Sequence, residues 1–126
     1  MIGFDGLVLQ DTTPIYQQIV QYIQRGLVAG TIQNGEELPS RRVLSALLGV
    51  NPNTVQRAYR ILEEDGLVQS HTGAKSYVAA DEKRLAALRT ELLENDVGAM
   101  AAALRQSGLG LEEAKQLLEK LWEAEP

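Results

Sequence analysis

The first eighty residues carry apolar positions at the spacing of amphipathic helices. One stripe predicts a core helix over about residues 14–29 and consists of Ile15, Tyr16, Ile19, Val20, Ile23, Leu27 and Val28. Thr13 precedes Pro14, so we expect the Thr13 hydroxyl to cap this helix and Pro14 to occupy its first position, where the missing N–H costs nothing. Gly30 follows as the C-terminal stop.

A short second helix is predicted from Arg41 to Leu48. Ser40 supplies a hydroxyl cap at its start, and Gly49 ends it. We expect the apolar side chains of this helix to face the core; they are Val43, Leu44, Leu47 and Leu48.

A third helix follows this turn directly and is expected to end at about Asp65, before Gly66. Asn51 is the expected cap, and Pro52 suits the first helical position. Apolar residues spaced i, i+3, i+4 and i+7 predict its buried stripe, which is Val55, Ala58, Tyr59 and Leu62. Two helices joined by so tight a glycine-containing turn are typical of a helix-turn-helix.

The opposite face of the third helix is polar and carries no acidic side chain. Its residues recur at the same spacing and are Asn53, Gln56, Arg57 and Arg60. Asparagine and glutamine amides pair bidentately with adenine, and arginine pairs with guanine. An ordinary solvated face usually mixes charges of both signs, so the pattern favours a DNA-reading face over a merely solvated one.

Two short strand-like runs follow, Leu67–Ser70 and Ser76–Ala79, separated by a turn-rich loop over residues 71–75. The pair predicts a β-hairpin wing. His71 and Lys75 at its tip suit contact with a phosphate backbone or minor groove, while simple solvation of the lysine is an equally good interpretation.

The C-terminal third predicts two more amphipathic helices, one over about residues 81–106 and one after Gly110. The apolar stripe of the first drifts near Asn95, which allows a kink there. Two such helices expose more apolar surface than they can bury against each other, which favours a partner pair from a second subunit over packing back on a monomer. The expected dimerisation residues are Leu85, Leu88, Leu92, Val97, Met100, Leu104, Leu117, Leu118, Leu121 and Trp122.

The composition excludes several classes of chemistry. The 126 residues include no cysteine and a single histidine, so no disulfide, thiolate nucleophile or cysteine-bound metal is available. We predict no catalytic residues, no metal and no cofactor, and hence no enzyme. Because no stretch approaches a membrane span and no signal peptide opens the chain, we expect a cytoplasmic protein without a membrane partner.

The charge is distributed unevenly. The net charge is −5, but residues 38–62 contain Arg41, Arg42, Arg57 and Arg60 and no aspartate or glutamate. The chain is therefore acidic overall with one locally cationic segment, which suits a polyanionic partner.

These motifs resemble the GntR family of bacterial winged helix-turn-helix regulators, most closely its small YtrA-like subfamily. The resemblance lies in residues 14–19 (PIYQQI), 30–40 (GTIQNGEELPS), 48–55 (LGVNPNTV), 58–63 (AYRILE) and 65–68 (DGLV). It implies a mostly α fold with a small β-hairpin. A winged helix-turn-helix domain over residues 1–79 is expected to precede a two-helix dimerisation hairpin over residues 80–126.

The resemblance also implies which side chains approach DNA. Arg42 matches the arginine of the family's Pro-Ser-x-Arg motif after Ser40, and Arg41 adds a possible phosphate contact. The recognition helix brings residues that in the family lie near DNA, namely Asn51, Asn53, Thr54, Gln56 and Arg57. The wing departs from the family's Gly-Lys-Gly-Thr-Phe-Val, because residues 73–78 (GAKSYV) move the lysine one place and lack the second glycine.

Together these observations predict a sequence-specific transcriptional regulator, a repressor, that binds a palindromic operator in double-stranded DNA as a homodimer. A twofold dimer gives its recognition helices the separation of one DNA turn, roughly 34 Å. The alternative is a winged-helix protein–protein interaction module without DNA binding, although such modules tend to lose the cationic stripe that this chain keeps. A small-molecule effector is a candidate ligand, but no residue marks its site.

Overall fold

The computed structural model describes residues 1–71 and 75–124 of the chain. The chain divides into two compact units, Met1–Arg89 and Thr90–Pro126. We call them unit 1 and unit 2 and treat each by itself.

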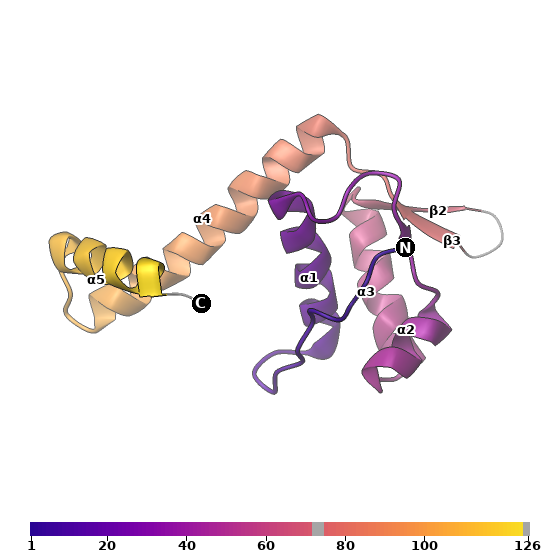
Figure 1. Ribbon diagram of the computed structural model, residues 1–126, viewed down its shortest axis with the longest axis horizontal. Helices are drawn as coiled ribbons and strands as arrows, with labels where there is room; N and C mark the ends of the chain where they lie inside the picture. Colours follow the sequence, from indigo (N-terminus) through magenta and orange to yellow (C-terminus); the bar gives the residue numbers. More distant parts are fainter. Residues whose placement is uncertain (72–74, 125–126) are drawn as a thin grey trace. The chain divides into compact units, whose positions relative to one another are not determined.

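Unit 1 is built around three helices, α1 (Ile15–Ala29), α2 (Arg41–Leu48) and α3 (Pro52–Glu64). Helix α3 contacts α1, α2 and strand β2 (Val68–His71), so it lies at the centre of the unit (Figure 1). Asn53, Arg57 and Arg60 are exposed, so one side of α3 is left uncovered by other elements.

The predicted cap of α1 is wrong. The N-cap position is Pro14, which makes no side-chain cap hydrogen bond. The backbone N–H groups of Gln17 and Gln18 donate to the Pro14 carbonyl oxygen. The buried Gln18 side chain bridges to the preceding loop instead, because its Nε2 donates to the Thr13 carbonyl oxygen at 2.8 Å.

The caps of the helix-turn-helix are confirmed. Ser40 Oγ accepts a hydrogen bond from the Val43 N–H at 3.1 Å, and Asn51 Oδ1 accepts one from the Asn53 N–H at 2.8 Å. Gly49 ends α2 with φ of 67°, in the left-handed region where glycine is favoured. Local side-chain chemistry therefore sets both ends of the turn.

Of the four residues predicted to face the core from α2, two do so and two do not. Leu44 is fully buried and Leu48 half-buried, whereas Val43 is 49% exposed and Leu47 66% exposed. Val43 and Leu47 each precede a packed leucine by one position, which places them about 100° around the helix from the packed side. The buried side is completed instead by Ser45, whose hydroxyl donates to the Arg42 carbonyl oxygen.

The hairpin is confirmed and belongs to a three-stranded antiparallel sheet. The strands are β1 (Glu37–Leu38), β2 (Val68–His71) and β3 (Lys75–Val78), in the order β1-β3-β2. His71 pairs with Lys75, so these residues end the two strands and do not lie in the loop as expected. The rest of the expected loop, residues 72–74, lies outside the described residues.

The core of unit 1 lies between the helices and the sheet. Its fully buried residues include Ile19, Ile23, Leu44, Val55 and Leu62. The buried stripe predicted for α3 is confirmed. Ile2 and Phe4 of the N-terminal segment complete this core, with the Ile2 N–H donating to the Glu37 carbonyl oxygen at 2.8 Å.

Helix α4 (Glu82–Gln106) runs through the predicted kink position as one helix and belongs to both units. Asp81 Oδ1 accepts from the Arg84 N–H at 2.7 Å and so caps its start. Helix α5 (Leu111–Ala124) follows a turn at Gly108, where φ is 84°. Within the described ranges, no helix has the length and apolar character that crossing a membrane requires.

Candidate nucleic-acid interface

The exposed side of α3 carries most of the residues predicted to read DNA. Asn53, Arg57 and Arg60 are exposed, while Thr54 and Gln56 are half-buried at its edges. Asn51 is exposed at the N-cap, where its side chain is engaged with the Asn53 N–H. The fold thus presents a polar, cationic surface on the side of α3 that faces away from the core.

Arg57 is held from the side by an aromatic ring of α1. Its guanidinium carbon lies over the ring of Tyr16, 3.8 Å from the ring centroid. The sequence pattern placed Tyr16 in the hydrophobic stripe of α1 and gave no sign of this contact, because the two residues lie far apart in the chain. Tyr16 is therefore part of the site although sequence reasoning missed it.

Gln56 lies on the other edge of α3, two turns before Glu63. Glu63 Oε2 accepts a hydrogen bond from the Ser70 hydroxyl of β2 at 3.3 Å. The Gln56 Oε1 atom is buried and makes no hydrogen bond to any described residue. An unsatisfied buried acceptor costs about 1–3 kcal/mol, so the Gln56 side chain is held at an energetic disadvantage.

The N-terminus of α2 contributes a second cationic patch. Ser40, Arg41 and Arg42 are all exposed, and the first turn of α2 contains no acidic residue. In the described part of the chain, no carboxylate forms an ion pair with any of the four arginines of the helix-turn-helix, Arg41, Arg42, Arg57 and Arg60. The partial positive charge of the helix terminus adds to theirs, which favours phosphate.

A buried hydrogen bond joins α3 to the start of α2. The Tyr59 hydroxyl donates to the Pro39 carbonyl oxygen at 2.7 Å, next to the cap residue Ser40. Burial raises the pKa of the Tyr59 hydroxyl above its ordinary value, and the nearby Arg41 charge offsets only part of this. Tyr59 therefore fixes the position of the α2 N-terminus relative to α3 as a neutral donor.

The wing residues lie at the described end of the hairpin. His71 and Lys75 are exposed and face each other as the last residue pair of β2 and β3. The His71 ring packs edge-on against Tyr77, with 5.1 Å between the ring centroids. This contact gives the imidazole a defined orientation at the tip of the sheet.

The predicted dimerisation residues divide between the two units. Leu88 is only 2% exposed and lies in the core of unit 1, and Leu85 packs against the same core. The Leu88 side chain is therefore already packed within the chain, whereas contact of the partly buried Leu85 with a second subunit stays a prediction.

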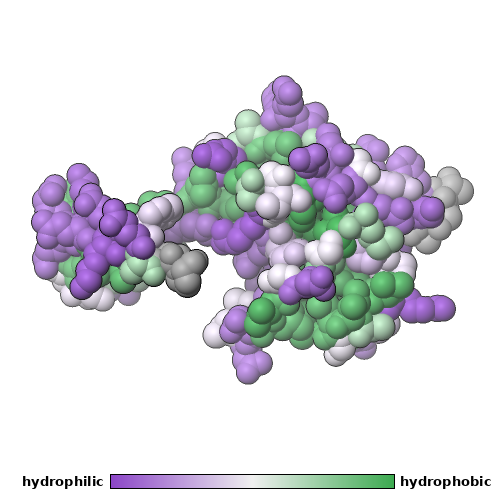
Figure 2. Space-filling view, viewed as in Figure 1, coloured by the Kyte–Doolittle hydropathy of each residue, from purple (hydrophilic) through white to green (hydrophobic). Residues whose placement is uncertain are grey.

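The other dimerisation residues belong to unit 2. Leu92 and Leu104 are half-buried, and large apolar side chains are exposed at Val97, Met100, Leu117, Leu118, Leu121 and Trp122. Trp122 is 75% exposed. The side of α5 visible in Figure 2 is hydrophilic, as expected for a helix whose apolar residues share one face.

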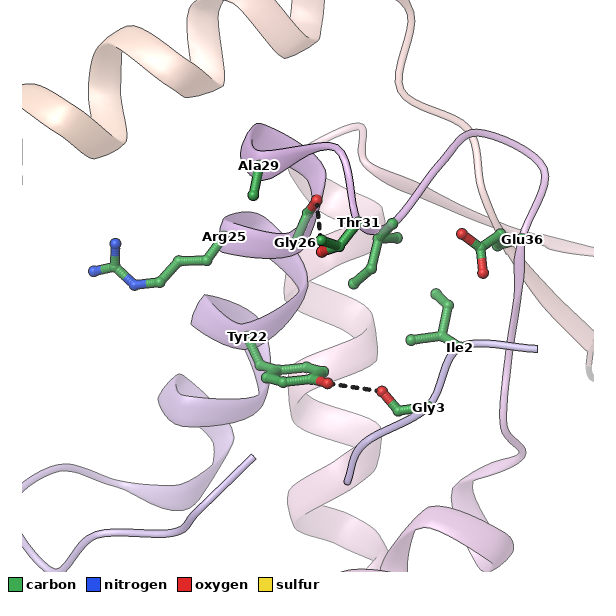
Figure 3. Close-up of a pocket in the computed structure, with 9 residues that line it drawn as sticks. Ile2, Gly3, Tyr22, Arg25, Gly26, Ala29, Thr31 and Glu36 are labelled. Atoms are coloured by element: carbon green, nitrogen blue, oxygen red, sulfur yellow. Dashed lines mark hydrogen bonds between the residues drawn. The ribbon is translucent and has the colours of Figure 1, made fainter. Parts of the chain in front are cut away.

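Unit 1 also has a surface pocket of about 330 Å³ beside the second half of α1 (Figure 3). Its polar groups are already engaged: the Tyr22 hydroxyl donates to the Gly3 carbonyl oxygen at 2.8 Å, and Glu36 Oε1 accepts from the Gln33 N–H at 2.9 Å. The Arg25 side chain extends away from the pocket (Figure 3). The pocket therefore offers little polar chemistry for holding a ligand.

Residues that bind metals are not gathered anywhere in the described ranges. No group of three or more histidine, cysteine, aspartate or glutamate side chains there is suitably placed.

Comparison with known proteins agrees with this geometry. The model of the gntR family of bacterial regulatory proteins matches residues 15–78. The HTH-type transcriptional repressor YtrA of Bacillus subtilis (strain 168) is 33% identical over 114 residues, covering 90% of this chain and 83% of that protein. The uncharacterized HTH-type transcriptional regulator YhcF of the same organism is 32% identical over 104 residues, covering 82% of this chain and 86% of that protein.

Solved structures show the same similarity. A GntR family transcriptional regulator from Listeria monocytogenes has a TM-score of 0.80 and 33% identity, with 89% of this chain and 98% of that chain covered. YtrA from Sulfolobus acidocaldarius, a GntR-family transcription factor, has a TM-score of 0.57 and 32% identity, with 75% and 95% covered.

Proposed function

The chain belongs to the gntR family of bacterial regulatory proteins, and from this premise we propose that it is a transcriptional repressor that binds a palindromic operator as a homodimer. The observation that carries the proposal is the pair of exposed cationic surfaces on the outer side of α3 and at the N-terminus of α2. Four arginines stand there without a carboxylate partner among the described residues.

The residues of α3 are proposed to read bases in the major groove. Arg57 and Arg60 present guanidinium groups suited to guanine, and Asn53 presents an amide suited to adenine. Gln56 is proposed to read adenine in the same way once its buried Oε1 turns toward the base. Thr54 and Asn51 lie at the start of the helix, where side chains approach base edges in helix-turn-helix proteins.

The flanking residues are proposed to hold the phosphate backbone. Ser40, Arg41 and Arg42 sit at the N-terminus of α2, where the helix dipole adds to the arginine charges. His71 and Lys75, which pair at the end of the hairpin, are proposed to contact a neighbouring phosphate or the minor groove. These contacts set the register of α3 on the duplex and carry little sequence information.

The exposed apolar side chains of unit 2 support the homodimer. Contiguous apolar surface on a helix pair is costly in water and is normally buried against a partner. A second copy presents the same surface, so a twofold interface is self-complementary. The two recognition helices then meet half-sites about 34 Å apart, and the operator is palindromic.

We further propose that an effector relieves repression by changing how the two α4–α5 hairpins pack. Helix α4 supplies residues to both units, so it connects the proposed dimer contact to the DNA-binding unit. The effector's action is then a change in the separation of the two recognition helices, which lowers affinity for half-sites of fixed spacing.

Fluorescence anisotropy on DNA from upstream of the protein's own gene tests the DNA-binding part of this proposal. Arg42→Ala and Arg57→Ala are each expected to weaken binding by roughly 1–3 kcal/mol if the arginine contacts a base, or to reduce the salt slope by about one per half-site if it contacts phosphate. Lys120→Ala removes an exposed positive charge from α5 and is the matched control. Binding that both arginine variants leave unchanged contradicts the assignment.

A further inference from the structure

We propose that Tyr16 is a positioning residue for DNA recognition, which holds Arg57 in the orientation that meets the operator. This inference rests on the proposed function, because it assigns a partner to an arginine of the proposed reading surface. It extends that surface to the first turn of α1, an element that does not belong to the helix-turn-helix.

The geometry is that of a cation–π contact. The Arg57 guanidinium carbon lies over the Tyr16 ring at 3.8 Å from its centroid, well inside the distance of about 6 Å at which such contacts act. No described residue accepts a hydrogen bond from Arg57, so its N–H groups are available for the bidentate hydrogen bonds that guanidinium forms with guanine or phosphate. The ring therefore fixes Arg57 without using its donors.

The ring is itself held firmly. Tyr16 is half-buried and packs against the core of unit 1, one turn before the fully buried Ile19. Its hydroxyl accepts a hydrogen bond from Gln17 Nε2 at 3.3 Å. Arg57, in contrast, is exposed on α3. A fixed aromatic platform thus meets a long side chain that is otherwise free to sample many rotamers.

The contact has a direct consequence for binding. A free arginine side chain loses rotamer entropy when it is fixed on DNA, and a side chain that is already stacked loses less. The aromatic face also favours arginine over a side chain without a positive charge. Removing the ring is therefore expected to weaken DNA binding through Arg57 and not through the stability of the fold.

No neighbouring charged residue accounts for the position of the Arg57 side chain. No carboxylate in the described ranges forms an ion pair with Arg57, so its position is not set by a salt bridge. Ile61, one turn after Arg57 on α3, and the C-cap residue Asp65 line a surface pocket together with Tyr16. Arg57 is thus the arginine of α3 whose side chain is held by a residue of α1.

The test is a double-mutant cycle between Tyr16 and Arg57. The probe is a duplex enriched by the wild-type protein from a randomised pool, and dissociation constants are measured by anisotropy for Tyr16→Leu, Tyr16→Phe, Arg57→Ala and the double variant Tyr16→Leu/Arg57→Ala. Urea unfolding of each variant at one protein concentration reports on the fold separately.

Tyr16→Leu keeps an apolar side chain but removes the ring, and we expect binding to weaken about 2- to 5-fold per half-site, or about 4- to 25-fold for two half-sites. Tyr16→Phe keeps the ring and is expected to bind within about 2-fold of wild type. In the Arg57→Ala background, Tyr16→Leu is expected to have no further effect, because the side chain it positions is absent.

Two results overturn the proposal: wild-type affinity for Tyr16→Leu, or an equal loss from Tyr16→Leu with and without Arg57. A loss for Tyr16→Phe as large as that for Tyr16→Leu also overturns it, since the hydroxyl and not the ring is then responsible. Failure of the wild-type protein to enrich any duplex contradicts the proposed function itself, which separates the two failures.

Discussion

Removing the Tyr59 hydroxyl is expected to destabilise unit 1 by a measurable amount. In Tyr59→Phe the ring stays in the core, where Tyr59 is only 6% exposed, but the 2.7 Å hydrogen bond to the Pro39 carbonyl oxygen is lost. A buried hydrogen bond contributes about 0.5–1.5 kcal/mol net, and an orphaned buried carbonyl adds a desolvation cost. We therefore expect the free energy of unfolding to fall by about 1–2 kcal/mol.

The assay is urea unfolding at a single protein concentration, followed by circular dichroism. For a slope of about 2 kcal/mol per molar urea, the loss corresponds to a midpoint lowered by about 0.5–1 M. The matched control is Tyr22→Phe, which removes a hydroxyl bonded to the Gly3 carbonyl oxygen at 2.8 Å on the exposed surface. Water replaces that bond, so a loss below about 0.5 kcal/mol is expected.

The same variant tests whether this bond positions the N-terminus of α2. Because Pro39 precedes the cap residue Ser40, we expect Tyr59→Phe to weaken DNA binding modestly even at temperatures where the protein is fully folded. A Tyr59→Phe protein as stable as wild type would refute the reasoning, and so would a loss no larger than that of Tyr22→Phe.

Three further outcomes follow from particular residues. The folded-state pKa of Tyr59 is raised above its ordinary value of 10.0, so its contribution to stability is fully present below about pH 10 and is lost as the pH rises further. In urea unfolding at increasing pH, wild type is therefore expected to lose stability above about pH 10, and Tyr59→Phe to lose less. Gln56→Leu removes a buried acceptor without a partner, so we expect unchanged or higher stability together with weaker operator binding; a variant that is both less stable and equally tight on DNA contradicts this. Gly49→Ala has free space around the new methyl group but a φ of 67°, so backbone strain alone is expected to lower the unfolding free energy by about 1–2 kcal/mol in thermal or urea unfolding.

The features that sequence analysis predicted are local ones. Ser40, Gly49 and Asn51 act on backbone groups within a few residues, so their caps and the turn between α2 and α3 are readable from residue type and order. The buried stripe of α3 follows from helical spacing in the same way. Thr13 shows the limit of this reasoning, because the helix starts one residue later than the pattern suggests, with Pro14 at the N-cap position.

The features it missed depend on segments that meet only in the folded chain. Strand β1 has two residues, too few for an alternating pattern, and forms because β3 lies beside it. Leu88 has the spacing of an exposed helical stripe but is buried where α4 meets the core of unit 1. The contacts of Tyr16 with Arg57 and of Tyr59 with Pro39 likewise join residues far apart in sequence.

The most direct test of the central claim is the affinity and stoichiometry of the wild-type protein on upstream DNA and on a scrambled duplex, at several salt concentrations. An arginine-bearing surface binds any duplex weakly, so specificity requires about 10³-fold or more preference for the operator. The account predicts such a preference, with two subunits per site and a palindromic footprint. Equal, weak binding to both duplexes, together with no motif recovered from a genome-wide binding-site selection, would contradict it.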